Sequence, residues 1–594
     1  MRWKNLFSLF VRSFWVLFIL VGCNMFPKTP NISTTTVTEI SLNTQTPSPT
    51  LIPSPTTPIP NITNTIEPIL NQNKHQIGIR QSEGIGEFFL KDNGEKFTPR
   101  GVNYAFVPTN SGFTNLLLRV GIYDPDLTRR DFKNLADLGY NTVRVFLDQC
   151  NQGPGCIANT DKPGLNPAYL DNITDMMLAA REAGIFILFT SNDLPDAGGY
   201  AEEANFNSGS DFAGYRNSYY LRPQAITATR RYWRDLITGL NERNPAFVAV
   251  LGWQLLNEQW MFRDQPPLSL TSGSVETTTG TYDMGDPKQK EQMVSDGIIY
   301  YIQQMKEEIL SHDPTALVTM GFFVPELVAP DWYVETKSLL EKSDLDFFDF
   351  HAYPGSLSLE AHVEAFGMLD YSAKPIILGE YGPFRHIFPD LKNAARVTTN
   401  WVAESCQYGF DGWLYWTYYP ANASAGDRTW GLMDEDAYLL NLFSPNNQPD
   451  PCVAVEIPRD NIAYGKPVQA SQNLAEELPE YAVDDDPTTQ WGSGSDAPQW
   501  ITVDLENNYR VSEIRLLVAQ WPQGNTLHRL LIRQSETGDY IPVHAFSGIT
   551  RDNDWLVFKP NPPLENVRQI RIQTDSSPSW VSWKEIVIKG EIMP

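Results

Sequence analysis

Short apolar runs alternate with longer amphipathic stretches between residues 78 and 450. This alternation constrains the fold more than any other feature, because a chain that passes repeatedly from strand to helix builds a parallel sheet covered by helices. Eight such runs predict a (β/α)₈ TIM barrel with loop insertions. The predicted strands are 97–106, 141–148, 185–192, 248–256, 317–323, 346–353, 374–380 and 411–418. The predicted helices are 130–139, 166–183, 226–243, 289–312, 358–368 and 390–408.

Two short motifs each place a glutamate where an apolar run ends. They are Trp253-Gln-Leu-Leu-Asn257-Glu258 and Ile376-Ile-Leu-Gly379-Glu380-Tyr-Gly382. The carboxyl ends of barrel strands share one rim, and active sites lie there. Two carboxyl groups that meet at this rim can break a glycosidic bond, one as the proton donor and one as the nucleophile. Surface or salt-bridge glutamates are the alternative.

Four further motifs stand at predicted strand ends. Together with the two glutamate motifs, they are the basis on which residues 78–450 resemble glycoside hydrolase family 5, a cellulase and mannanase family of (β/α)₈ enzymes. They are Arg100-Gly-Val-Asn103, Asn141-Thr-Val-Arg144, His351-Ala-Tyr353 and Trp416. The resemblance implies a retaining double displacement, with Glu258 as the general acid/base and Glu380 as the nucleophile. It implies no cofactor for catalysis.

The chemistry assigns an environment to each glutamate. The acid has to keep its proton near neutral pH, so we expect Glu258 in the less solvated position. The nucleophile has to be ionised, so we expect cationic or hydrogen-bonding neighbours around Glu380. The resemblance implies that these neighbours, together with the other substrate-binding side chains, are Arg144, Asn257, His351, Tyr353, Trp416 and Asn103. A buried ion pair, core packing and a turn cap are the alternatives for Arg144, Trp416 and Asn103.

Two departures from the family pattern leave the substrate open. Gln259 follows Glu258 where the family usually has proline, and Thr190-Ser-Asn192-Asp193 lacks a histidine that many members carry. We predict an endo-β-glycanase acting on β-mannan or β-glucan. An exo-acting β-glucosidase or β-mannosidase would need the long insertions 193–225 or 259–287 to close one end of the cleft. The third hypothesis is a non-catalytic surface lipoprotein that only binds glycan.

A second unit is predicted for residues 456–594, where helical periodicity gives way to short alternating strands. This spacing is typical of an all-β sandwich. The predicted strands are 500–505, 511–518, 528–534, 541–546, 555–559, 567–573 and 582–588.

The second unit resembles the coagulation factor 5/8 type C (discoidin) domain, a jelly-roll sandwich that occurs in bacterial enzymes as a carbohydrate-binding module. The matching stretches are 461–467, 482–491, 499–505 and 583–588. The family often holds a structural Ca²⁺, and the matching side chains here are Asp484, Asp486, Thr489 and Glu585. Asp485 stands where the family usually has glycine, and a solvated turn is the alternative. Candidate sugar-binding residues are Trp521, His528, Arg551 and Trp580, whereas Trp491 and Trp500 are expected in the core.

The N-terminus predicts export. Residues 1–22 form a signal peptide, and Leu20-Val21-Gly22-Cys23 resembles a lipobox in which Cys23 is lipidated. A plain secretory peptide is the alternative. Residues 23–76, rich in Thr, Pro and Ser, predict a disordered linker that acts as a stalk. We therefore expect an extracytoplasmic protein anchored by lipid to the membrane or cell surface.

The remaining four cysteines predict two disulfides in an oxidising compartment, Cys150 with Cys156 and Cys406 with Cys452. The net charge of −26 argues against nucleic acid as a partner. We expect a monomer whose partner is a polysaccharide.

Overall fold

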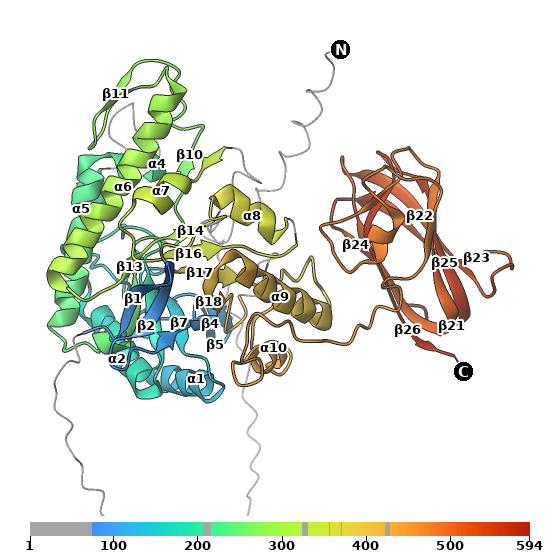
Figure 1. Ribbon diagram of the computed structural model, residues 1–594, viewed down its shortest axis with the longest axis horizontal. Helices are drawn as coiled ribbons and strands as arrows, with labels where there is room; N and C mark the ends of the chain where they lie inside the picture. The colour runs from blue at the N-terminus through green and yellow to red at the C-terminus, as the bar shows by residue number, and fades with distance from the viewer. Residues whose placement is uncertain are drawn as a thin grey trace, which may run out of the picture.

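The computed structural model describes residues 74–205, 215–323, 331–355, 357–369, 371–421 and 428–593. The predicted signal peptide, Cys23 and almost all of the predicted stalk lie outside these residues. Figure 1 shows two bodies, an α/β unit and an all-β unit, joined by one segment of chain. Within the described part of the chain, no helix is long and apolar enough to cross a membrane.

The first body is a closed parallel barrel. Its strands are β4 (Arg100–Asn103), β7 (Thr142–Phe146), β8 (Phe186–Thr190), β9 (Val250–Gln254), β13 (Val318–Thr319), β14 (Gly321–Phe322), β16 (Phe348–His351), β17 (Ile376–Tyr381) and β18 (Phe410–Tyr415). The hydrogen-bonded path runs from β13 through β9, β8, β7, β4, β18, β17 and β16 to β14. Because β13 and β14 are one segment interrupted at Met320, the path closes with eight strand positions. The prediction of a (β/α)₈ barrel is confirmed.

Helices surround the barrel and begin at residues with clear start signals. Proline occupies the first turn of several helices, where its missing N–H removes no hydrogen bond, and Asp or Asn caps them. The helices with such caps are α1 (Pro125–Asp137, capped by Asp124), α2 (Pro167–Ala183, capped by Asn166), α6 (Pro287–His312, capped by Asp286) and α9 (Leu391–Ser405, capped by Asp390). The others are α5 (Pro223–Asn241), α7 (Lys337–Lys342), α8 (Leu359–Phe366) and α10 (Tyr438–Leu442).

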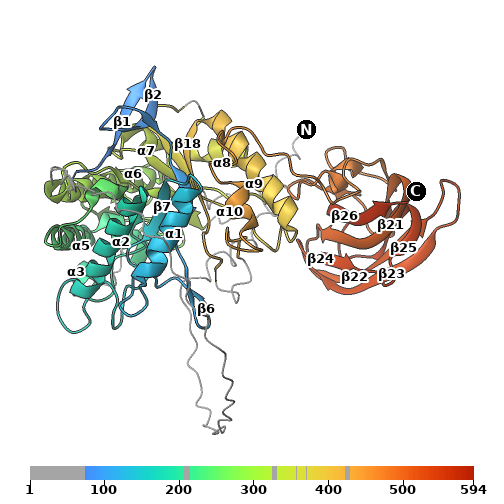
Figure 2. The ribbon, with the colours of Figure 1, turned by 90° about the horizontal axis from the view of Figure 1, so that it is seen from below.

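A small antiparallel sheet closes the amino-terminal end of the barrel. It consists of β1 (Ile77–Ser82), β2 (Ile85–Leu90) and β3 (Lys96–Phe97), and it stands at one end of the barrel in Figure 2. Ile77, Phe88 and Phe97 pack against the first residues of the barrel strands. His75 is buried and its Nε2 lies 2.7 Å from Asp313 Oδ2. Folded structure thus begins before residue 77, where the predicted linker was expected to end.

The two long insertions are joined to each other. The first holds α3 (Tyr200–Ala204) and α4 (Tyr215–Leu221), and the second holds β10 (Met261–Phe262), β11 (Ser274–Glu276) and β12 (Thr281–Asp283). The Asn217 side chain donates to the carbonyls of Phe262, Gln265 and Pro266, and it accepts from the Phe262 amide. Strand β10 also pairs with β15 (Trp332–Tyr333). The insertions therefore form one connected structure beside the barrel strands β8 and β9.

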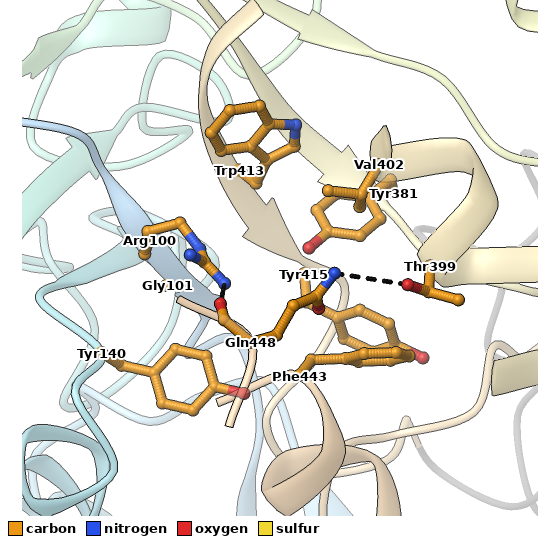
Figure 3. Close-up of a pocket in the computed structure, with 10 residues that line it drawn as sticks. All are labelled: Arg100, Gly101, Tyr140, Tyr381, Thr399, Val402, Trp413, Tyr415, Phe443 and Gln448. Carbon is orange, nitrogen blue, oxygen red and sulfur yellow. Dashed lines mark hydrogen bonds between the residues drawn. The ribbon is translucent and has the colours of Figure 1, made fainter. Parts of the chain in front are cut away.

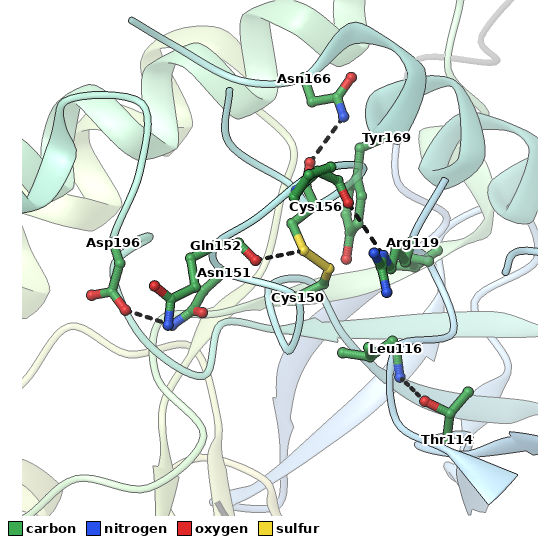
Figure 4. The surroundings of a disulfide bond; sticks show 12 residues. Thr114, Leu116, Arg119, Cys150, Asn151, Gln152, Cys156, Asn166, Tyr169 and Asp196 are labelled. Atoms are coloured by element: carbon green, nitrogen blue, oxygen red, sulfur yellow. Dashed lines mark hydrogen bonds between the residues drawn. A yellow bond between two sulfur atoms is a disulfide. The ribbon is translucent and has the colours of Figure 1, made fainter. Parts of the chain in front are cut away.

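Two disulfides are present in the described residues. One joins Cys150 to Cys156 and closes a short loop after β7, shown in Figure 4, where Asn166 Nδ2 donates to the Cys156 carbonyl at 3.0 Å. The other joins Cys406 to Cys452 and ties the segment after the barrel to the end of α9.

The C-terminal body is an antiparallel sandwich, as predicted. The long strand β21 (Gln499–Val518) serves both layers, because its first half pairs with β25 (Leu564–Ser576) and its second half pairs with β26 (Ser582–Ile592) and β24 (Trp555–Phe558). The remaining strands are β19 (Val468–Ala470), β20 (Trp491–Gly492), β22 (Gly524–Arg533) and β23 (Ile541–Thr550). Trp491 and Trp583 lie in its core.

Ion pairs connect the sandwich to helix α9 of the barrel, which faces it in Figures 1 and 2. Arg396 of α9 donates to Asp485 at 3.1 Å, and Arg459 of the connecting segment donates to the same carboxylate oxygen at 2.9 Å. Lys589 of β26 donates to Asp390, the residue that caps α9. Arg396 and Asp485 are both buried, so this contact excludes water.

Candidate active site

The carboxyl ends of the barrel strands bring the predicted residues of the first unit to one rim. Each strand contributes its last residues because the parallel register aligns the strand ends. The residues and their strands are Asn103 at the end of β4, Arg144 in β7, Asn257 and Glu258 after β9, His351 at the end of β16 with Tyr353 just beyond it, Glu380 in β17 and Trp416 after β18.

Glu380 is held by one cation and one phenol. Arg144 Nη1 donates to Glu380 Oε1 at 2.6 Å, and the Tyr353 hydroxyl donates to Oε2 at 2.7 Å. Burial raises the pKa of Glu380, and the neighbouring charges of His351 and Arg144 oppose that rise. The arrangement suits a carboxylate that has to stay ionised inside the protein.

Glu258 is the more exposed member of the pair. Its side chain is 23% exposed, compared with 6% for Glu380. The expectation that Glu258 occupies the less solvated position is therefore wrong. The reason is topological, because β16 and β18 cover Glu380 on both sides, whereas Glu258 follows the last paired residue of β9.

His351 connects the two glutamates. Its Nδ1 lies 2.9 Å from Glu258 Oε1 and 3.7 Å from Glu380 Oε1. Burial lowers the pKa of His351, but the charges of Glu380 and Asp349 outweigh burial and raise it to about 10. The imidazole is therefore protonated at neutral pH and donates to Glu258 through Nδ1.

A ligand atom from each of Glu258, His351 and Glu380 lies within 4.8 Å of the other two. Such a group is also a possible metal site. However, Arg144 already neutralises Glu380, and a protonated imidazole has no lone pair on Nδ1 to offer. The electrostatics therefore favour a glutamate pair ready for acid–base chemistry over a cation site.

Arg144 is fully buried and joins several strands. In addition to Glu380, Arg144 donates to Asn103 Oδ1 at 2.9 Å, to Asn257 Oδ1 at 2.6 Å, and to Gln254 Oε1 at 2.6 and 2.9 Å. Asn103 is also fully buried, and its amide donates to carbonyls of β17 and β18, such as Gly379 at 2.8 Å. Asn103 therefore supports the site from behind, in place of the predicted contact with substrate.

Trp416 lies at the rim beside the glutamates' strands. It is half-buried, and Phe106 and Phe146 meet its ring edge-to-face at centroid distances of 6.4 and 6.0 Å. The two phenylalanines fix the ring, and its partial exposure leaves area for contact with a sugar.

Gln254 and Asp349 belong to the site although the sequence analysis did not single them out. Gln254 Nε2 donates to Asp349 Oδ2, and Asp349 lies 3.4 Å from Arg144 Nε and 3.6 Å from His351 Nε2. A signal was present in the sequence. Each is a polar residue inside an apolar strand, and Asp349 lies two positions before His351, on the same strand face.

A small cavity between barrel strands and helix α9, shown in Figure 3, contains neither glutamate. Arg100, at the start of β4, donates to the Gln448 carbonyl at 3.0 Å, and Gln448 donates to Thr399 of α9 at 3.3 Å. These contacts hold the segment after the barrel in place, so the cavity has a structural role.

In the C-terminal unit, Glu585 is the most buried of the predicted cation ligands. It is buried, neither of its carboxylate oxygens accepts a hydrogen bond of good geometry, and burial with the charges of Asp485 and Asp484 raises its pKa well above the usual value. Burial also raises the pKa of Asp484 to about 6. Thr489 Oγ1 donates to Asp484 Oδ2 at 2.8 Å and places these groups together. Hard oxygen donors without a partner fit Ca²⁺.

Asp485 does not disturb this cluster. It adopts a left-handed conformation with φ +61°, which explains why glycine suits this position. Its carboxylate accepts hydrogen bonds from Arg396, Arg459 and Asn461. The side chain thus serves the contact with the barrel.

The candidate sugar-binding residues of this unit separate by exposure. Trp521 and Trp580 are 56% and 50% exposed. Their loops are neighbours, because Gly524 lies against Pro578. His528 is buried, donates or accepts through Nδ1 with Thr574 at 2.8 Å and packs on Trp583, so it belongs to the core. Trp500 is partly buried beneath Arg571, and Arg551 is exposed.

Comparison with known families bears on this second unit. Residues 467–588 match the family model of the F5/8 type C domain. This unit is an F5/8 type C domain. The match does not extend into the barrel. No curated protein sequence matches the chain.

Solved structures resemble both units. An endo-1,4-β-mannanase from Rhizomucor miehei is 19% identical over 63% of this chain and 99% of its own, with a TM-score of 0.43. An exo-β-1,4-mannosidase from Opitutaceae bacterium strain TAV5 is 17% identical over 63% of this chain and 62% of its own, with a TM-score of 0.41. Chitosan-binding module 1 of a chitosanase/glucanase from Paenibacillus sp. IK-5 is 22% identical over 22% of this chain and 100% of its own, with a TM-score of 0.20.

Proposed function

We propose that the protein is a retaining glycoside hydrolase of the family 5 type that cleaves a β-linked polysaccharide, β-mannan or β-glucan. The observation that carries this proposal is the asymmetric glutamate pair. Glu380 is buried between Arg144 and Tyr353, and Glu258 is partly exposed beside His351. Their carboxylate oxygens approach within 4.8 Å, which suits the short separation of retaining enzymes and leaves no room for a water between nucleophile and sugar.

In the first step, Glu380 attacks the anomeric carbon while Glu258 gives its proton to the departing glycosidic oxygen. Arg144 and Tyr353 keep Glu380 ionised until it forms the covalent bond. In the second step, water attacks the anomeric carbon while Glu258 takes its proton, and the bond to Glu380 breaks to release the ionised carboxylate. The exposure of Glu258 suits this step because water has to reach it.

Neighbouring side chains would bind the sugar. Asn257 is held by Arg144 at 2.6 Å and lies next to Glu258, where its amide can donate to the sugar 2-hydroxyl. That contact strengthens as positive charge develops on the ring. Trp416 would provide the floor beneath the same sugar.

An exo-acting enzyme is the second candidate. The observation that favours it is the clasp that Asn217 forms between the two insertions, together with the pairing of β10 of the second insertion with β15. A connected wall beside β8 and β9 can close one end of a cleft. The glutamate pair argues against the third hypothesis, a protein that only binds glycan.

Substrate screening with product sizing separates these candidates. The protein should begin at Lys74, because His75 is buried in the barrel. Mannan, glucomannan, cellulose and xyloglucan are the substrates to compare. Oligosaccharides of several sizes indicate endo action, and a single small product released from the chain end indicates exo action. Loss of all hydrolysis in a Glu380→Ala variant ties activity to this site, and unchanged hydrolysis would refute the proposal.

We further propose that the F5/8 type C domain holds the enzyme on its glycan and contains a structural Ca²⁺. Glu585, Asp484, Asp486 and Thr489 would bind the ion, which fixes a turn and takes no part in catalysis. The exposed rings of Trp521 and Trp580 offer flat faces for stacking on sugars. Replacing both by alanine should weaken retention on insoluble glycan and spare the hydrolysis of small soluble substrates.

For location, we propose an extracytoplasmic protein anchored through lipid on Cys23. The two disulfides support an oxidising compartment. Incorporation of labelled fatty acid into the full chain, and its loss in Cys23→Ala, tests the anchor. A labelled Cys23→Ala protein would contradict it.

A further inference from the structure

Asp349 is a fully buried carboxylate on the barrel-facing side of β16, two residues before His351. Its Oδ2 accepts from Gln254 Nε2 and faces both cations of the site, at 3.4 Å from Arg144 Nε and 3.6 Å from His351 Nε2. Asp349 therefore lies beside Arg144 and His351, on the side of each that is turned away from the glutamate pair.

The protein backbone makes room for this carboxylate. A Cβ atom added to Gly379 would lie 1.6 Å from Asp349 Oδ1. Any side chain at Gly379, the residue before the nucleophile, would displace Asp349. Strand β17 thus carries the nucleophile, and the missing side chain of its neighbour Gly379 leaves space for the Asp349 carboxylate.

Acid catalysis requires a proton on Glu258, and the charges around Asp349 have to balance with that proton in place. The charged and titratable groups that face this cluster are Arg144 of β7, Glu258 after β9, His351 of β16 and Glu380 of β17, with the Tyr353 hydroxyl on Glu380, whose pKa burial raises so that it carries no charge. If Asp349 and Glu380 are ionised opposite Arg144 and a protonated His351, these four charges cancel. A proton on Glu258, which the role of acid requires, then leaves the cluster without net charge.

Resting on the function proposed above, we propose that Asp349 is a positioning residue that keeps His351 protonated and thereby keeps the proton of Glu258 available for the leaving group. Without Asp349, a neutral His351 could accept the Glu258 proton through Nδ1. An imidazolium without Asp349 would instead favour the ionised form of Glu258. In either case, Glu258 would lose its proton at a lower pH than in the parent protein.

The test uses Asp349→Asn, which preserves shape and removes the charge. The basic limb of the pH profile of kcat/KM should move to lower pH by about one unit or more, since a charge at this distance has effects of that size. Asp313→Asn is the matched control, because Asp313 is a buried aspartate that accepts from the buried His75 at the opposite end of the barrel. It should leave the profile unchanged.

A double variant tests whether charge is the cause. Gln254→Glu combined with Asp349→Asn exchanges the two groups of one hydrogen bond and returns a carboxylate beside Arg144. The basic limb should move back toward that of the parent protein. A profile for Asp349→Asn that matches the parent, with only kcat reduced, would mean that Asp349 is merely structural and would overturn the proposal.

Nitrogen NMR of the parent protein tests the same idea without activity or a variant of Asp349. His351, assigned with a His351→Gln variant, should show an imidazolium at pH 7. A neutral ring at pH 7 would refute the role of Asp349. Because this measurement needs no substrate, failure of the positioning role and failure of the proposed glycosidase activity can be told apart.

Discussion

Replacing Glu585 by glutamine tests the proposed cation site through stability. Without a cation, the buried Glu585 carboxyl has to take up a proton on folding, because its folded pKa is raised well above its unfolded value of 4.5. A raised pKa contributes stability that is present below the unfolded value and is lost as the pH rises toward the folded value.

The magnitude follows from linkage. Each pH unit in this window costs about 1.4 kcal/mol, so a rise from pH 5 to pH 7 should destabilise the cation-free domain. For a domain of this size, each kcal/mol lost corresponds to about 4 °C in the melting temperature. Ca²⁺ at about 100 times its dissociation constant would return about 3 kcal/mol, and more at pH 7 than at pH 5.

The assay is thermal melting of the protein from Lys74, with Ca²⁺ or a chelator, at both pH values. Glu585→Gln should lose most of the difference that the parent protein shows between Ca²⁺ and chelator at pH 7. Glu513→Gln is the control, because Glu513 lies in the same domain but is paired with Arg515 and Lys559, so its response to Ca²⁺ should match that of the parent. Identical parent curves with Ca²⁺ and chelator at pH 7 would refute the reasoning.

Three further outcomes are expected. Glu380→Ala should lose turnover by about 10³-fold or more, and azide should restore it by forming a glycosyl azide of inverted configuration; no rescue would argue against a covalent intermediate. Glu258→Gln should still react in the first step with good leaving groups while natural glycans stay intact, and equal loss on both would contradict an acid role. Arg396→Gln removes the α9 partner of Asp485 and leaves Arg459 on the same oxygen, so the cost should stay below the roughly 3 kcal/mol of an unpaired buried charge, and limited proteolysis between residues 450 and 460 should accelerate. Unchanged proteolysis would mean that this ion pair does not hold the domains together.

Several elements of this chain follow from local sequence. The run 374–380 ends in Glu380, and β17 ends one residue later, because a continuous apolar segment flanked by polar turns has few other ways to be buried. The Asp124 and Asn166 caps, each followed by proline, mark helix starts through local backbone hydrogen bonding alone. The disulfide between Cys150 and Cys156 follows from a turn-rich spacing.

Other features depended on contacts between distant residues. The small sheet of β1 to β3, the clasp made by Asn217 and the pair formed by Asp349 and Gly379 join segments that no local pattern connects. The solvation of the glutamates belongs to the same class. Local sequence places both at strand ends, but only the neighbouring strands determine that Glu380 is covered and Glu258 is not.

The sequence by itself determined which residue types reach the rim, because apolar periodicity and strand-end polarity are local properties of the chain. The tertiary structure alone decided their charges. Whether His351 carries a proton depends on burial and on carboxylates from other positions of the barrel, and electrostatic energy falls with distances that only the closed sheet sets. The same holds for Asp485, whose side chain is explained by an arginine on a helix of the other domain.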